Sequence, residues 1–372
     1  MTIVVTSFTP DRVEAVKAFN CRLYDSGERI FRLPEHPNSS WLPPDSRTGL
    51  FEEFYIANDG DQVRGGYILK HQPFWLNGSV ASVGCPYAPV SEAATNSKFG
   101  VIGFQLLLHA LRHQKFLYGL GGGGFENRYP KLLGAMGWKQ FAVPFFFFVT
   151  RPAALLDNLT YASRYVGGKL VAQILAHSGL GWLTLRAINA WRASAPPNAR
   201  ELSPEPVIEF GEEADAIWHA ARTICSLVAV RDRRLLNQLY RSPRDRFIRL
   251  RVSRSGKVVG WAVALDTRMS ANKFFGNARV GSVIDCLALP GSEQDVVHAV
   301  TRILDARGVD IIVTNQTHET WCAAFRRVGW MRGPSNFIFS SSPKLTERLA
   351  PFEARQPRLH FTRGDGEGPS HL

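Results

Sequence analysis

The sequence predicts a mixed α/β protein made of two copies of one domain, each with a mainly antiparallel sheet flanked by helices. An internal repeat is the main observation: the segment FYIANDGDQVRGGYIL from Phe54 resembles FIRLRVSRSGKVVGWAVAL from Phe247. Two further pairs recur with the same following residues, namely Gly78 with Gly281 and Gly137 with Gly329. A repeat of this size indicates two domains, and a chain of 372 residues also favours two cores.

The elements of the first copy follow one another as strand, helix, three strands, helix, strand, helix and strand. The β-branched residues 3–6 predict the first strand, and the spacing of Val13, Val16, Phe19 and Leu23 predicts the helix after it. A turn at residues 58–60 marks a hairpin, and residues 78–83 predict its neighbour. The apolar run FAVPFFFFV at residues 141–149 is too short to span a bilayer and predicts a buried strand.

These patterns divide the chain into four parts. We expect a first domain at residues 1–152, a basic helical linker at 153–205, a second domain at 206–350 and a disordered tail at 351–372. Between Arg151 and Arg200 there are six Lys or Arg residues and one acid, and apolar residues including Trp182 and Trp191 are spaced roughly as helix faces. The linker either packs on the domains or lies on an anionic membrane surface.

Charge and cysteine content narrow the function classes. The net charge of +12 and the pI of about 9.7 favour an anionic partner, such as nucleic acid, anionic lipid or a phosphorylated cofactor, although a basic surface alone also explains them. The five cysteines are widely spaced without a CxxC pair, so we expect reduced thiols and no metal site. No signal peptide is evident. We therefore expect a cytoplasmic protein, with peripheral contact at the inner membrane surface as an open alternative.

The most informative stretch runs from Lys98 to Trp138. It begins with KFGVIG at residues 98–103, which opens a helix whose first N–H groups are suited to bind a phosphate-sized anion. A short strand at residues 116–120 follows. Four glycines then allow a ligand or another backbone to approach the end of that strand closely, or allow two layers to pack.

This order of elements resembles the GNAT superfamily of N-acetyltransferases in a tandem form. In that family a loop of type [QR]-x-x-G-x-[GA] holds the pyrophosphate of acyl-coenzyme A. Here Lys98 stands for the usual Arg or Gln and Gly103 for the final glycine, while Val101 replaces a usual glycine and Gly100 comes one position early. The resemblance implies an acyl-CoA site formed by the following residues: Pro89, Val90, Lys98, Phe99, Gly100, Val101, Ile102, Gly103 and Asn127.

The second copy departs further from this pattern. Its corresponding segment, PGSEQD at residues 290–295, has no basic residue and no second glycine. Acidic residues in a first helical turn suit the helix dipole but repel a pyrophosphate. The first copy is therefore the expected cofactor-binding half.

The resemblance also implies candidate catalytic residues, each with a structural alternative. Tyr129 either protonates the departing thiolate or packs in the core, and Asn127 either binds the pantetheine arm or caps its helix. Glu126 is a candidate base or a solvated loop acid, and the same choice applies to Glu92. Asp285 lies in an apolar strand, which predicts a raised pKa for a catalytic or a structural carboxylate.

The implied function is N-acyl transfer from acyl-CoA, or from an acyl carrier protein, to an amine acceptor. The acceptor is expected to be a small molecule such as an amino sugar or amino acid of polysaccharide or envelope synthesis. A FemAB-like transferase using aminoacyl-tRNA is the enzymatic alternative, with tRNA as partner. A non-catalytic pair of degenerate domains that acts as a binding module is the other.

Overall fold

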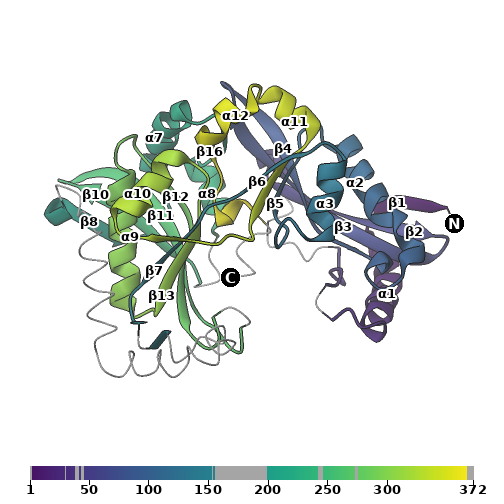
Figure 1. Ribbon diagram of the computed structural model, residues 1–372. Helices are drawn as coiled ribbons and strands as arrows, with labels where there is room; N and C mark the ends of the chain where they lie inside the picture. Colours follow the sequence, from purple (N-terminus) through teal and green to yellow (C-terminus); the bar gives the residue numbers. More distant parts are fainter. Residues whose placement is uncertain are drawn as a thin grey trace. The chain divides into compact units, whose positions relative to one another are not determined.

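The computed structural model of the chain describes residues 2–29, 31–37, 42, 46–152, 154–155, 199–241, 246–272 and 275–366. The chain forms two compact units (Figure 1). Unit 1 contains Met1–Ala142, Asn336–Ala354 and a short piece that begins at Gly366, and unit 2 contains Val143–Ser335 and Arg355–Asp365. Each unit is a mixed α/β structure with mainly antiparallel strands, so the predicted fold class is confirmed.

The sheet of unit 1 begins with four antiparallel strands in chain order. They are β1 (Ile3–Ser7), β2 (Phe51–Asp59), β3 (Gln62–Leu76) and β4 (Ser79–Ser91). A second group has β15 (Ile338–Ser341) between β5 (Tyr118–Gly121) and β6 (Lys139–Ala142), antiparallel to both. The short helices α11 (Pro343–Arg348) and α12 (Phe352–Arg355) follow β15.

Helices cover both faces of the first four strands. Alternate residues of β3 point to opposite faces: Tyr67 and Leu69 pack with α2 (Val101–His113), whereas Ile68 packs with α1 (Val13–Asp25). The helix α3 (Arg128–Ala135) contributes Leu133 to the α2 side (Figure 1). This period-two alternation in a long strand explains why the sheet is buried on both faces.

Unit 2 is built on a seven-stranded sheet in the order β14-β7-β13-β12-β11-β10-β8. The bounds are β7 (Phe145–Val149), β8 (Leu202–Pro206), β10 (Ile248–Arg254), β11 (Lys257–Arg268), β12 (Arg279–Ala288), β13 (Ile311–Asn315) and β14 (Met331–Gly333). Only β12 and β13 are parallel to each other among these neighbours. In unit 2, β9 (Leu227–Ala229) also pairs in parallel with β16 (Leu359–His360).

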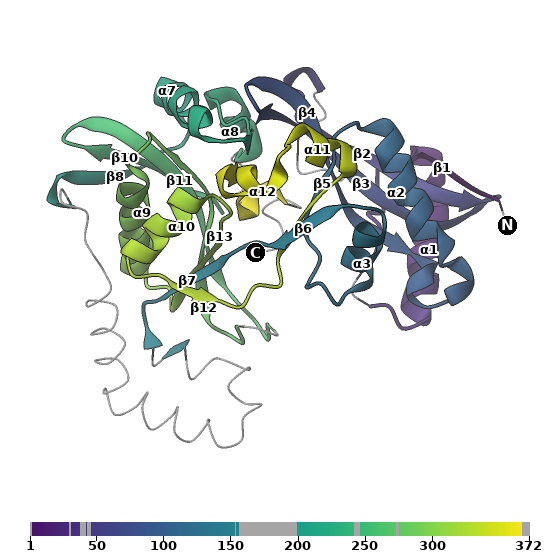
Figure 2. The same cartoon turned by 45° about the horizontal axis from the view of Figure 1, so that its top comes forward.

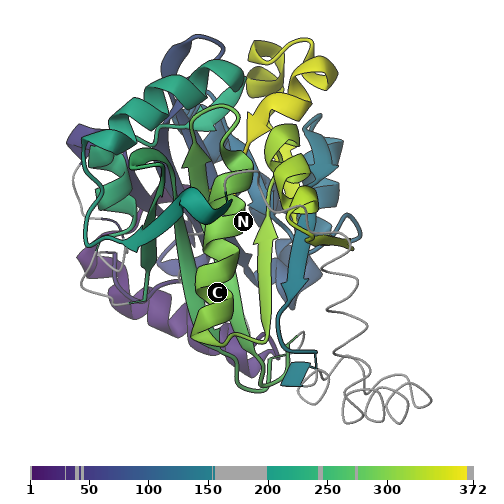
Figure 3. The same ribbon diagram turned by 90° about the vertical axis from the view of Figure 1, so that its left-hand side faces the viewer.

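The helices of unit 2 also lie on both faces of its sheet. α9 (Glu293–Arg307) runs along one face, as Figure 3 shows, and α10 (Glu319–Arg327) packs beside it. The other face carries α7 (Glu212–Ala221), which lies next to α8 (Arg233–Leu239) in Figure 2. Adjacent residues of β11 show the division, because Gly260 approaches Val296 of α9 while Trp261 packs against Phe210, just before α7.

The two units exchange strands, which the sequence did not predict. The phenylalanine-rich segment, expected in the first domain, forms β6 in unit 1 and β7 in unit 2, where β7 lies between β13 and β14. In return β15, expected in the second domain, lies between β5 and β6 in unit 1. The observed units therefore differ from the contiguous domains 1–152 and 206–350.

The structure describes little of the expected linker but most of the expected tail. Most of the expected linker, residues 153 and 156–198, lies outside the described residues, and its last residues belong to β8. The tail was expected to be disordered from residue 351, but it is ordered through Gly366 and contains α12 and β16. The apolar residues of this tail are buried. Its composition, which is rich in Pro, Gly and charged residues, does not indicate that burial. Among the described residues, no helix is both long and apolar enough to cross a bilayer.

Candidate functional site

In unit 1 the strands β4 and β5 meet and then diverge. Gly84 forms an isolated parallel bridge with Leu117, and its N–H donates to the carbonyl of Phe116 at 2.8 Å. Beyond this point β4 continues to Ser91 paired only with β3, while β5 pairs with β15. We call the region where β4 and β5 diverge the unit 1 wedge.

The divergence has local causes in the sequence. A Cβ at Gly84 would lie 2.7 Å from atoms of both Gln114 and Leu117, so only glycine lets the strands approach here. Further along β4, Ala88 has a φ of 48°, and the register shifts so that Ala88 and Pro89 together oppose Tyr67. This bulge bends β4 away from its straight course.

The start of α2 offers an anion-binding turn beside β4. Asn96 accepts the N–H of Lys98 at 3.0 Å and so fixes the short 3₁₀ turn Ser97–Phe99 before the helix. The side chains of Lys98 and Val101 are exposed, and a Cβ at Gly103 would meet nothing within 4 Å. Because the first N–H groups of an α-helix have no partner within it, this turn presents donors and a positive charge to open space.

The predicted cofactor-binding residues thus fall into two groups. Lys98, Gly100 and Val101 are exposed at the helix start, as is Pro89 in the bulge of β4. Phe99, Ile102 and Val90 are buried in the core of unit 1 and hold the helix and strand in place. The guanidinium carbon of Arg64 lies over the ring of Phe99, 4.7 Å from the ring centroid.

The four-glycine loop after β5 is closed by Asn127. All four residues, Gly121 to Gly124, have positive φ values, which glycine adopts without strain. The side-chain amide of Asn127 donates to the carbonyl of Gly122 at 2.8 Å. Asn127 also stands at the N-cap position of α3, but its side chain does not cap the helix. Its observed contact is therefore with the glycine loop.

The candidate acid–base residues of unit 1 occupy different environments. Tyr129, in the first turn of α3, is half-buried against the cluster that contains Tyr55 and Tyr67. The side chain of Glu126 is 94% exposed, and its carboxylate lies 3.1 Å from the ammonium of Lys131. This arrangement is typical of a surface ion pair and gives Glu126 no buried position for use as a base.

Glu92 is a structural carboxylate. It is buried and accepts hydrogen bonds from Arg22 at 2.9 Å and from Arg64 at 2.8 Å. Each carboxylate oxygen thus accepts from a guanidinium group, and this charge pairing favours a structural role for Glu92 over use as a base. The sequence could not show this pairing, because the two arginines come from α1 and from β3.

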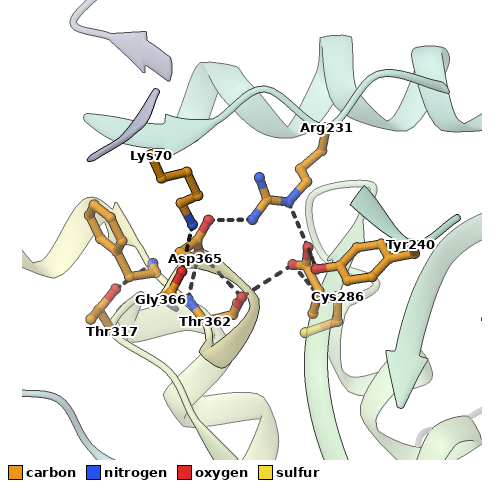
Figure 4. A network of polar contacts seen from close by, with 10 residues as sticks. Lys70, Arg231, Tyr240, Cys286, Thr317, Thr362, Asp365 and Gly366 are labelled. Atoms are coloured by element: carbon orange, nitrogen blue, oxygen red, sulfur yellow. Dashed lines mark hydrogen bonds and ion pairs between the residues drawn. The ribbon is translucent and has the colours of Figure 1, made fainter. Parts of the chain in front are cut away.

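Asp285 belongs to unit 2, whereas Tyr129 and Glu126 belong to unit 1. Asp285 accepts from the Nε of Arg231 and from the hydroxyl of Tyr240, each at 2.6 Å, and Figure 4 labels both of these donor residues. Arg231 also donates to Asp365, and all of these side chains are fully buried. Burial raises the pKa of Asp285, while the adjacent guanidinium acts against that rise. The geometry favours a structural role for Asp285 over a catalytic one.

A cluster of aromatic and imidazole side chains near α2 was not predicted. Tyr67 shares a hydrogen bond with His109 at 2.8 Å, and the rings of His109 and His113 lie 4.1 Å apart. Burial, with the neighbouring His113, lowers the pKa of His109 to about 4. The i, i+4 spacing of these histidines in a helix was the signal available in the sequence.

Comparison with solved structures decides the fold. A GCN5-related N-acetyltransferase from Anabaena variabilis matches at a TM-score of 0.53 and 10% identity, covering 91% of this chain and 72% of that one. A probable N-acyltransferase from Enterococcus faecalis matches at 0.51 and 10% identity, covering 94% and 74%. The chain has the GNAT fold. At this identity the likeness establishes the GNAT fold and leaves the reaction to be tested.

A third solved structure of the same fold carries a ligand. N-myristoyltransferase from Saccharomyces cerevisiae, with bound myristoyl-CoA, matches at a TM-score of 0.50 and 9% identity, covering 91% of this chain and 78% of that one. All three of these GNAT-fold neighbours are described as acyltransferases. No family model matches the sequence, and no curated protein matches it.

Proposed function

We propose that this GNAT-fold protein transfers an acyl group from acyl-CoA to an amine, and that the donor binds in the unit 1 wedge. The observation that carries the proposal is the divergence of β4 and β5 next to the basic start of α2. A thioester arm fits between diverging strands, and a pyrophosphate fits on free helix N–H groups beside Lys98. The acyltransferase descriptions of the structural neighbours support the same reaction class.

The residues present fit such a donor. Gly100 and Gly103 keep the first turn of α2 free of bulky side chains, and Lys98 adds a charge of the required sign. The backbone of β4 from Cys85 to the bulge at Ala88 lies along the wedge, where its polar groups are suited to orient a thioester carbonyl. Bound acyl-CoA supplies the activated acyl group itself.

The chemistry requires few groups from the protein. The amine nitrogen forms a bond to the thioester carbonyl carbon, the carbon–sulfur bond breaks, and the coenzyme leaves as a thiolate. Tyr129 is the proposed donor of the proton that this thiolate takes up. The amine loses its proton to solvent, because the exposed carboxylate of Glu126 has no buried position for use as a base. The proposed acceptor is a small amine such as an amino sugar or an amino acid.

The proposal is tested by calorimetric titration with acetyl-CoA and with longer acyl-CoAs. We expect binding, and we expect Lys98→Glu to weaken it about tenfold or more, because a charged contact to phosphate is lost and a repulsion is added. Lys257→Glu, an equally exposed charge reversal at the β10–β11 turn of unit 2, is the matched control and should leave the affinity unchanged.

A second measurement links binding to turnover. Release of free thiol from the bound acyl-CoA should depend on an added amine, screened over amino sugars and amino acids. Absence of acyl-CoA binding together with tRNA that stays with the purified protein would favour the aminoacyl-tRNA alternative. Binding without thiol release for any amine would favour a binding module.

A further inference from the structure

The parallel strands of unit 2 diverge in the same way as β4 and β5 of unit 1. Only three residues near the start of β12, Val280 to Ser282, pair with β13, while β12 continues to Ala288 along β11. Ile284 has no partner in the register, because Val263 pairs with Asp285 and Ala264 pairs with Val283. Unit 2 therefore has a bulge and a wedge of its own, between the later parts of β12 and β13.

This unit 2 wedge contains a segment of the chain itself, residues 359–365, which we call the C-terminal insert. On the β13 side, the N–H of Thr317 donates to the carbonyl of Phe361 at 3.2 Å, and the hydroxyl of Thr317 donates to the carbonyl of Leu359 at 2.5 Å. The N–H of Phe361 donates to the same hydroxyl at 2.8 Å, and Gln316 forms an isolated bridge with Thr362. The insert thus pairs with the two residues that directly follow β13, beyond the point where β12 departs.

The other side of the insert contacts β12. A Cβ at Gly364 would lie 3.2 Å from the carbonyl oxygen of Ile284, the bulged residue, and 2.3 Å from the hydroxyl of Tyr240. Thr362 donates to Asp365 from its backbone N–H at 2.9 Å and reaches Asp285 from its hydroxyl at 3.4 Å. The insert therefore spans the wedge from one strand to the other (Figure 4).

Burial and charge pairing hold the insert in place. Leu359, Phe361 and Asp365 are 0% exposed. Arg231 bridges Asp285 on β12 to Asp365 in the insert through two nitrogens of one guanidinium. Removal of the insert would leave Arg231 and Asp285 with fewer partners in an apolar interior, which is energetically costly.

Buried carboxylates also fill the space at the start of α9, the helix that follows β12. At the beginning of α9, the carboxylate of Glu293 is 4% exposed and accepts the N–H of Gly291 at 3.0 Å. Asp295 is equally buried and pairs with Arg254 at 2.7 Å. Two buried carboxylates thus stand in unit 2 where unit 1 presents Lys98, and they exclude a pyrophosphate by charge and by space.

We propose that the C-terminal insert is a built-in occupant of the unit 2 wedge, so that each chain binds one acyl-CoA, in unit 1 only. The placement of the insert in the unit 2 wedge follows from the contacts above. The single acyl-CoA site rests on the proposed function. The second copy of the fold then keeps its architecture while its ligand position is filled by the protein itself.

The stoichiometry of acyl-CoA binding tests the single acyl-CoA site. Calorimetry of the wild-type chain with acetyl-CoA should give one site per chain, and Lys98→Glu should weaken that site about tenfold or more without revealing another. Two sites in the wild type, or an unchanged single site in Lys98→Glu, would overturn the proposal. No binding at all would refute the proposed function. The placement of the insert would then be tested by hydrogen exchange alone.

Hydrogen exchange of the protein without ligand tests the insert directly. The amides of Phe361, Thr362 and Asp365 should exchange at least about 100-fold more slowly than in an unfolded chain, because each donates a hydrogen bond inside the wedge. Gly364→Ala should speed their exchange about tenfold or more, since the added carbon meets the Tyr240 hydroxyl. Fast exchange in the wild type, or no effect of Gly364→Ala, would overturn the proposal.

A double variant separates displacement of the insert from general damage. Tyr240→Phe removes the oxygen that the new methyl group meets, so the effect of Gly364→Ala should be smaller in that background than in the wild type. An equal or larger effect in the Tyr240→Phe background would contradict the placement of Gly364 against Tyr240.

Discussion

At the scale of single residues, the buried ion pairs of Arg231 are the most consequential contacts of unit 2. Arg231 binds Asp285 and Asp365, and its removal leaves two buried carboxylates without a counter-charge. We expect Arg231→Met to lower the free energy of unfolding by about 3–5 kcal/mol, measured by chemical denaturation. Arg251→Met, which removes the partly exposed pair with Glu205, is the control and should cost less than about 1 kcal/mol. Equal losses in the two variants would contradict this account.

The buried histidine of the insert predicts a dependence of stability on pH. His360 is 1% exposed, and burial with the neighbouring His318 lowers its pKa to about 3. In an unfolded chain the histidine pKa is about 6.5, so the unfolded state binds more protons between these values. The free energy of unfolding should therefore fall as pH decreases from about 6.5 toward 3, by up to about 1.4 kcal/mol per pH unit from this group.

The variant His360→Phe isolates this contribution from the carboxylates that titrate in the same range. Denaturation curves at several pH values between 7 and 4 should show a shallower fall of the unfolding free energy in the variant than in the wild type. Parallel curves for the two proteins would show that His360 does not titrate as its burial requires.

The sequence predicts part of this residue-scale information. The position of Asp285 in an apolar strand predicts a raised pKa, and burial does raise it. Its partners were not predictable, because Arg231 follows β9 and Asp365 lies in the segment after β16. Glu126 and Glu92 are indistinguishable in the sequence as loop acids, yet one is exposed and the other is held by two arginines.

At the scale of elements, each unit has a closely packed glycine where two parallel strands meet. Gly84 stands where β4 meets Leu117, and Gly281 pairs with Ile312 of β13. A Cβ at Gly84 would lie 2.7 Å from its neighbours, and one at Gly281 would lie 3.2 Å from Leu304. Alanine at either position should destabilise the protein by about 1–3 kcal/mol through overpacking.

The two substitutions should differ in their effect on ligand binding. Gly84→Ala should weaken acyl-CoA binding about tenfold or more, because it deforms the unit 1 wedge, and Gly281→Ala should leave the affinity unchanged. Calorimetry on both variants, under conditions where each is folded, makes the comparison. The reverse order of effects would assign the ligand to unit 2.

Strand existence was predictable from residue patterns, but strand pairing was not. The segments of β7 and β15 contain β-forming residues, so each fits a strand position in either copy. Because the two copies share one fold, the local pattern does not specify which copy receives which strand. That choice depends on long-range packing, such as the contact of Phe146 with Phe325 inside unit 2.

At the scale of the whole molecule, two copies of one fold have acquired opposite electrostatic character at the same position. The start of α2 in unit 1 carries Lys98 and small residues, whereas the start of α9 in unit 2 buries Glu293 and Asp295. This asymmetry was predictable, because helix-start residues follow directly from the sequence. The insert in unit 2 was not predictable, because its composition resembles that of a disordered tail.

Hydrogen exchange in the presence and absence of acetyl-CoA tests the central claim most directly. The account predicts that saturating acetyl-CoA slows exchange about tenfold or more at the start of α2, residues 98–103, and along β4 beyond Gly84. It also predicts no change along β12 and at the start of α9. Protection at β12 and α9 with none at residues 98–103, or no protection anywhere at saturating acetyl-CoA, would contradict it.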